Sequence, residues 1–111
     1  MSKSHVVPIK TSLNTGSLSP VIDCKHKYSK RIHIFGSANS MTNITPCYST
    51  EIDGNYIPAR QKETMLLSYT INGVTKNFFN FHIDYPPHYI KLLNSSDVNE
   101  TNLNVNVVHH Y

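Results

Sequence analysis

Apolar and polar residues alternate along much of this chain, and the clearest alternation flanks a two-residue turn signal. Asn72-Gly73 separates two runs, residues 64–71 and 74–85, that are rich in β-branched and aromatic side chains. Asn and Gly tolerate the positive φ angles that a type I′ turn requires. The pattern therefore predicts a β-hairpin centred on this turn.

The turn also predicts which residues of the two strands face each other. A two-residue loop places Ile71 opposite Val74, and the register continues outward from there. The remaining pairs are Tyr69–Lys76, Leu67–Phe78 and Met65–Asn80 on one face, and Thr70–Thr75, Ser68–Asn77 and Leu66–Phe79 on the other. Apolar residues occupy both faces away from the turn, so we expect the hairpin base to be buried on both sides. A β-bulge between Asn77 and Asn80 is the alternative.

Several other short segments have the composition of strands. Residues 5–10, 21–24, 32–35 and 102–108 are predicted strands, and residues 88–93 form a strand or a short helix. Pro8 places the first of these at a sheet edge or in an irregular arm. Residues 36–40 and Asp53-Gly54 read as turns, and no segment has the periodicity and caps of an amphipathic helix. We therefore predict an all-β fold, a single antiparallel β-sandwich or small barrel of roughly six to eight strands.

Length and charge narrow the functional classes. The 111 residues suffice for one domain, residues 1–111, and 39% of them are hydrophobic while 15% are charged. A net charge of +3 carries no strong nucleic-acid signal. No apolar run approaches the roughly 20 residues of a membrane span, and the N-terminus lacks the apolar region of a signal peptide. As written, the chain is expected in the cytoplasm, with secretion by another route left open.

Residue types that carry catalysis or bind metals are present but scattered. The hairpin register brings Glu63 opposite His82, a pair that we interpret as a structural cross-strand contact. Cys24 and His26 supply at most two ligands, so we predict neither a metal nor a cofactor. Cys24 and Cys47 are interpreted as reduced, buried thiols, and one disulfide is the alternative.

The only concentrated charge is a basic segment, residues 25–31. Its cations are Lys25, Lys27, Lys30 and Arg31. Lysine and arginine side chains interleaved with a tyrosine can bind phosphate groups, so these four residues form a candidate anion site. A solvated loop is the structural alternative.

An aromatic corner, residues 84–89, follows the second strand of the hairpin. Tyr85, His88 and Tyr89 surround Pro86-Pro87, which stops the strand. Aromatic faces attract quaternary ammonium groups and stack on sugar rings, so these three residues form a candidate site for a choline headgroup or a glycan. The alternative is a corner packed by its own aromatic residues.

One part of the chain resembles a known group of proteins. Residues 67–71 enter the turn as Leu-Ser-Tyr-Thr-Ile, and an aromatic strand from Phe78 to Tyr85 runs into Pro86. On these residues, the span from Ala59 to Tyr89 resembles the aegerolysin and actinoporin-like membrane-binding β-sandwich proteins. The resemblance implies a headgroup site at Tyr85, His88 and Tyr89.

Two functional hypotheses from different classes follow. The first is a non-enzymatic recognition module that binds a membrane lipid headgroup or a glycan. The second is a small accessory, inhibitor or immunity protein of the viral or phage type, which binds a protein partner through an exposed sheet edge or face. An exposed edge strand at residues 103–108 would favour the second hypothesis or a homodimer. An enzyme ranks third, because no catalytic signature is present.

Overall fold

The computed structural model describes residues 4–25, 29–39, 43–59, 64–65, 67–96 and 102–111, and these form two antiparallel sheets. The first sheet contains, in spatial order, β1 (Ser4–Thr11), β10 (Leu103–His110), β3 (Arg31–Ala38), β8 (Val74–Asp84) and β7 (Leu67–Ile71). The second contains β2 (Ile22–Asp23), β9 (Tyr89–Asn94), β4 (Asn43–Ser49) and β5 (Ile57–Pro58), and β6 (Thr64–Met65) also pairs with β4.

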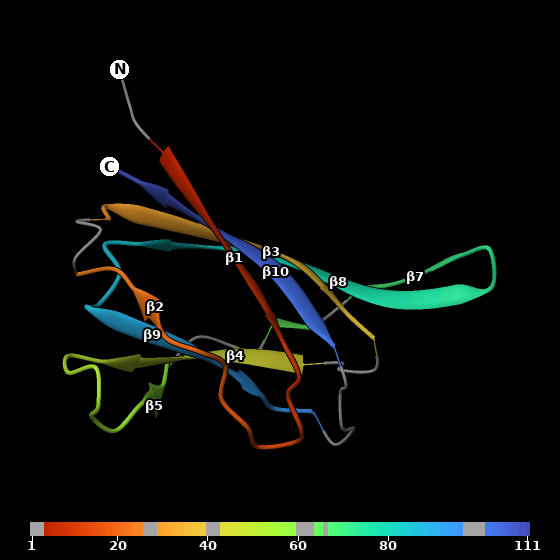
Figure 1. Ribbon diagram of the computed structural model, residues 1–111, viewed down its shortest axis with the longest axis horizontal. Helices are drawn as coiled ribbons and strands as arrows, with labels where there is room; N and C mark the ends of the chain where they lie inside the picture. Colours follow the sequence, from red (N-terminus) through yellow and green to blue (C-terminus); the bar gives the residue numbers. More distant parts are fainter. Residues whose placement is uncertain (1–3, 26–28, 40–42, 60–63, 66, 97–101) are drawn as a thin grey trace.

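The two sheets lie in layers, one above the other in Figure 1. The fold is therefore the predicted all-β sandwich and not a closed barrel. Its two five-stranded sheets exceed the predicted six to eight strands, because the predicted run 64–71 is divided between β6 and β7 and because β4 was not predicted. None of the described residues forms a helix long and apolar enough to cross a membrane.

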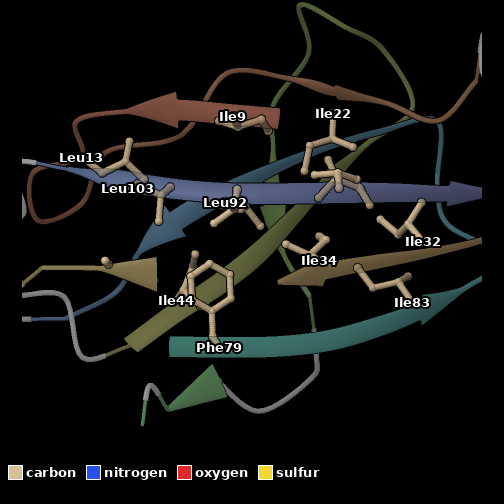
Figure 2. Close-up of a cluster of buried hydrophobic side chains, with 14 of the residues drawn as sticks. Ile9, Leu13, Ile22, Ile32, Ile34, Ile44, Phe79, Ile83, Leu92 and Leu103 are labelled. Atoms are coloured by element: carbon tan, nitrogen blue, oxygen red, sulfur yellow. The ribbon is translucent and has the colours of Figure 1, made fainter. Parts of the chain in front are cut away.

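The space between the sheets is filled by branched aliphatic side chains, which Figure 2 shows projecting from both layers. Ile32 and Ile34 of β3 and Val105 and Val107 of β10 are completely buried, and they meet Leu92 of β9 from the second sheet. Burial of each such side chain contributes about 1.5–3 kcal/mol. The alternation along β3 and β10 thus directs one face of the first sheet into the core and leaves the other in solvent.

The hairpin near Asn72-Gly73 has the predicted register. Ile71 pairs with Val74, Tyr69 with Lys76 and Leu67 with Phe78. Asn72 and Gly73 have φ angles of 51° and 76°, the positive values that the turn requires. In Figure 1 this hairpin extends beyond the second sheet, so its turn lies at an exposed end of the molecule.

The predicted base of the hairpin is wrong in two respects. Met65 pairs with Asn43 of the second sheet and not with Asn80, because the chain changes sheets between β6 and β7. Phe79 is buried whereas Phe78 is 42% exposed, so β8 is covered on one side here. The β3–β8 register is continuous from Asn77 to Asp84 and contains no bulge, and beyond Phe78, where the described pairing with β7 ends, β3 is the described partner of β8.

The predicted turn at residues 36–40 is also wrong at its start. Strand β3 continues through Gly36 to Ala38, and a Cβ atom on Gly36 would lie 2.3 Å from the carbonyl oxygen of Asn104. Glycine here permits close approach of β10, not a turn. The next strand along the chain, β4, was not predicted, because several consecutive residues of it are buried and it therefore lacks an alternating pattern.

The C-terminal alternating segment is the predicted half-buried strand, but it is not an edge. Strand β10 runs from Leu103 to His110 and pairs with β1 on one side and β3 on the other. The exposed edge at residues 103–108 that would favour protein pairing or a homodimer is therefore not present. The edge strands of this sheet are β1 and β7, and β1 carries Pro8, which was predicted at a sheet edge or in an irregular arm.

Candidate functional site

Tyr85 is the most unusual residue of the aromatic corner. Strand β8 ends at Asp84, and Tyr85 adopts a φ angle of 48°, a left-handed conformation that L-residues other than Asn and Asp seldom adopt. Its side chain is 86% exposed. Pro86 follows directly and disfavours continued regular structure. The corner thus holds an aromatic ring in solvent on a strained backbone.

The backbone of Lys30 joins this corner to the C-terminal strand. The amide of Tyr85 donates a hydrogen bond to the carbonyl oxygen of Lys30 at 2.7 Å, and the amide of Lys30 donates to the carbonyl oxygen of His110 at 2.9 Å. Arg31, the next residue, lies opposite Asp84 on β8 and opposite His110 on β10. Three segments far apart in sequence therefore meet at one end of the first sheet, on the left of Figure 1.

These segments form an open groove of about 400 Å³, which we call the end groove. Its lining residues are Lys30, Arg31, Asp84, Tyr85, His110 and Tyr111. The side chains combine two permanent cations, one carboxylate, two phenols and an imidazole. Ammonium and guanidinium groups bind phosphate or sulfate oxygens, and tyrosine rings stack on a sugar or a quaternary ammonium group. The arrangement can therefore hold a small anionic or zwitterionic group.

The structure does not bring the three predicted ligand residues together. Tyr85 lies in the end groove, whereas Tyr89 is 5% exposed and forms part of β9. His88 is exposed, and its Nδ1 lies 3.3 Å from the carbonyl oxygen of Thr50. Its ring meets that of Tyr89 edge-on, with centroids 6.3 Å apart. Tyr89 is therefore a packing residue of the sandwich, in line with the alternative of a corner packed by its own aromatic residues. Of the three residues, Tyr85 is the one that lines the groove.

The predicted basic segment is divided in the same way. Lys30 and Arg31 line the end groove, but Lys25 is exposed beside the other side of the corner, where its amide donates to the carbonyl oxygen of His88 at 3.1 Å. Lys27 lies outside the described residues. Between the two parts, the hydroxyl of Ser29 lies 2.6 Å from Nδ1 of the buried His109. Of the described cations of this segment, Lys25 thus lies apart from Lys30 and Arg31.

Asp84, His110 and Tyr111 are groove residues that the sequence interpretation did not select. Asp84 stood at the start of the aromatic corner but was assigned no role. The alternation along residues 103–107 does continue into His109 and His110, which predicts opposite orientations, and His109 is indeed buried while His110 is half-buried. No local signal relates these residues to Lys30, because the contact depends on pairing between β10 and β3.

Glu63, the carboxylate of the predicted carboxylate–imidazole pair, lies outside the described residues. His82 instead stacks on His33 of β3, with ring centroids 4.1 Å apart. Within the described part of the chain, no three His, Cys, Asp or Glu side chains gather as a metal site would require.

The two cysteines are free and buried. Burial, together with the nearby Asp23 carboxylate, raises the pKa of the Cys24 thiol to about 12, and burial also raises the pKa of Cys47. Burial is the main cause that raises the pKa of Tyr48, and electrostatic repulsion from Cys24 is the smaller cause. The buried hydroxyl of Tyr48 has no hydrogen-bond partner. Thiols of raised pKa are poor nucleophiles. These residues pack the sandwich, as the interpretation of reduced thiols predicts.

A second pocket, of about 290 Å³, lies on the other side of the corner. It is formed mainly by the β4–β5 connection and includes Tyr48, Glu51, Ile57 and Pro87. Glu51 is its charged lining residue, so it lacks the cations that an anionic ligand requires. The end groove is the stronger candidate site for the predicted ligands. Comparison of the chain with protein-family models, curated proteins and solved structures finds no match.

Proposed function

We propose that this protein is a non-enzymatic recognition module that binds a phosphate- or sulfate-bearing surface target, a membrane lipid headgroup or a glycan, in the end groove. The observation that carries the proposal is Tyr85. Its ring is 86% exposed and its backbone is left-handed, and both features are unfavourable for stability. Strained residues of this kind gather at binding and catalytic sites, where the strain has a function.

The charges of the groove favour a phosphate group. Lys30 and Arg31 are adjacent in sequence and both are exposed, so each side chain can reach an anion in the groove. The guanidinium group of Arg31 can bind two phosphate oxygens at once. The backbone of Lys30 is held by hydrogen bonds to His110 and to Tyr85. Because this backbone is already ordered, ligand binding costs less conformational entropy.

The remaining groove residues favour a zwitterionic headgroup. Asp84 and the rings of Tyr85 and Tyr111 suit an ammonium group, through charge and through cation–π attraction. A headgroup such as phosphocholine presents a phosphate and an ammonium group a few ångströms apart, and the groove offers partners for both. Tyrosine is also suited to a membrane surface, because its ring is apolar and its hydroxyl polar.

Vesicle binding tests the proposal. Phosphatidylcholine vesicles, phosphatidylcholine vesicles with added phosphatidylserine, and heparin beads distinguish a zwitterionic lipid, an anionic lipid and a sulfated glycan. We expect the double variant Lys30→Ser/Arg31→Ser and the single variant Tyr85→Ala to lose binding. Lys25→Ser is the matched control, since Lys25 is an exposed lysine of the same basic segment outside the groove. Binding that survives in the double variant contradicts the proposal.

The alternative is a protein-binding accessory, inhibitor or immunity protein. The exposed Val6, on the outer face of edge strand β1, favours it. Pro8 in the same strand removes one backbone donor and weakens strand pairing at this edge. Capture of one stoichiometric protein partner by the wild type, lost in Val6→Ser but retained in Tyr85→Ala, would support this alternative; the same experiment detects a homodimer.

A further inference from the structure

The outer face of the first sheet carries a row of aromatic rings, which we call the aromatic strip. It consists of His82, His33, Phe35 and Phe78. The imidazoles of His82 and His33 are stacked, with centroids 4.1 Å apart and planes inclined by 18°. The ring centroids of His33 and Phe35 are 4.9 Å apart. Phe78 pairs with Ser37, two residues beyond Phe35 on the same strand.

The strip belongs to the solvent side of the sandwich. Strand β3 directs Ile32 and Ile34 into the core, so His33 and Phe35 project outward. Phe35 and Phe78 are 36% and 42% exposed. The β3–β8 register, and not any local motif, places these rings on the same face of two adjacent strands. The result is an exposed aromatic surface that the core does not require.

Polar and cationic side chains surround the strip. Asn80 contacts His33 through its side-chain oxygen, and Asn104 and Asn106 occupy outward positions on β10. Three cations share this outer face on three different strands, and they are Lys10, Arg31 and Lys76. Among the described residues of these strands, Asp84 is the one carboxylate on the same face. The surface around the rings is therefore basic.

We propose that this outer face binds single-stranded nucleic acid. Exposed rings on neighbouring strands can stack on successive bases, which all have an aromatic face. The asparagine amides can hydrogen-bond to base edges, and the surrounding cations can neutralise phosphates. The combination of flat rings with a basic surround is complementary to a chain of bases joined by phosphates. A neutral glycan or a second copy of this chain could also pack against the exposed rings, but neither would account for the three surrounding cations.

The site differs from the end groove, although Arg31 contributes to both. Tyr85 lies in the groove and outside the strip, whereas Phe35 and Phe78 lie in the strip and outside the groove. Variants of these residues therefore separate the two proposals. Ile57 is an exposed apolar residue of the second sheet and gives a matched control for the loss of an exposed hydrophobic side chain.

Fluorescence anisotropy of a labelled oligothymidylate tests the proposal on the full chain. An oligonucleotide of about 12 nucleotides matches the site sizes of comparable binding folds. We expect Phe35→Ala and Phe78→Ala each to weaken binding by about tenfold, the scale of one lost base-stacking contact. Lys10→Ser/Lys76→Ser should weaken binding and reduce its dependence on salt, because fewer counterions are released. Ile57→Ala and Tyr85→Ala should bind like the wild type.

Each remaining outcome would overturn the proposal. Absence of binding at low salt, or binding that is unchanged in both phenylalanine variants, excludes the strip as a nucleic-acid site. Binding lost in Tyr85→Ala places the oligonucleotide in the end groove. Glycan-array binding lost in Phe35→Ala, without oligonucleotide binding, identifies a glycan platform. Concentration-dependent dimerisation that is lost in Phe78→Ala, again without oligonucleotide binding, identifies a second copy as the occupant. Urea unfolding of each variant verifies that it is folded.

Discussion

The amide of Tyr85 donates a hydrogen bond of 2.7 Å to the carbonyl oxygen of Lys30. This contact joins the aromatic corner to the basic segment, two features that lie more than fifty positions apart in sequence. It also explains how the left-handed conformation of Tyr85 is maintained, because the chain is held at this residue before Pro86 redirects it. The proposed binding role and a stability cost therefore fall on the same residue.

Replacing Tyr85 with glycine should separate these two effects. Glycine accepts a φ angle of 48° without steric strain, although it loses more conformational entropy on folding. We expect Tyr85→Gly to leave the free energy of unfolding unchanged or to raise it by up to about 1 kcal/mol, and to abolish vesicle binding. Urea unfolding and vesicle co-sedimentation measure the two quantities. A marked loss of stability would show that the ring packs structurally, against our proposal.

Gly36→Ala should be among the most damaging substitutions in the sheet. The added Cβ atom would lie 2.3 Å from the carbonyl oxygen of Asn104 and 2.6 Å from the Cα atom of Val105, and both are backbone atoms of β10. We expect a loss of about 3 kcal/mol in the free energy of unfolding. Gly73→Ala is the control, because no atom lies within 4 Å of its added Cβ and only the positive φ opposes it, at about 1–2 kcal/mol. Equal losses in urea unfolding would disprove the close-approach explanation.

The buried side chain of Asn94 should be important for the loop that precedes β2. Its amide nitrogen donates to the carbonyl oxygen of Leu13 at 3.2 Å, and its oxygen accepts a hydrogen bond from the amide of Ser96 at 3.1 Å. Asn94→Ala leaves these groups without their partner, at a cost of about 2–3 kcal/mol. Asn104→Ala, an exposed asparagine on β10, should change stability by less than about 0.5 kcal/mol. Thermal unfolding of both variants tests the difference.

Stability should fall in alkali because of Cys24. The pKa of this thiol rises from an ordinary 9.0 to about 12 in the fold, through burial and the nearby Asp23. Above pH 9 the unfolded chain loses the thiol proton while the folded chain retains it, so this contribution is complete below pH 9 and is lost progressively as pH rises toward 12. Urea unfolding of Cys24→Ala should show a weaker decline than the wild type over this range. Parallel curves would contradict the assignment.

Local patterns predicted the parts of the fold that local chemistry determines. The Asn72-Gly73 hairpin has the predicted register because positive φ angles at two consecutive residues leave few other turns. The alternation in residues 103–107 predicted a half-buried strand, since side chains on a strand point to opposite faces in turn. At Gly36 the local pattern predicted a turn, and the close approach of β10 shows that the glycine belongs to a strand.

The candidate sites show the same division. Tyr85 and the basic segment were selected from the sequence because clustered cations, and aromatic residues around two prolines, are visible as local composition. In the structure Tyr85, Lys30 and Arg31 line one groove. His88 and Tyr89 were placed with Tyr85 because they are close in sequence, but β9 begins at Tyr89 and draws its side chain into the sandwich. Proximity along a chain that turns at two prolines does not imply a shared surface.

The sequence by itself determined the fold class, the hairpin turn and the residue types available for binding, because backbone sterics and the period of a strand act over a few residues. Only the tertiary structure decided which strands are neighbours, and hence that β3 lies between β8 and β10. That order brings Lys30 to His110 and Tyr85, and His33 to His82. The physical reason is that strand pairing and core burial act between distant segments, whose partners no local pattern specifies.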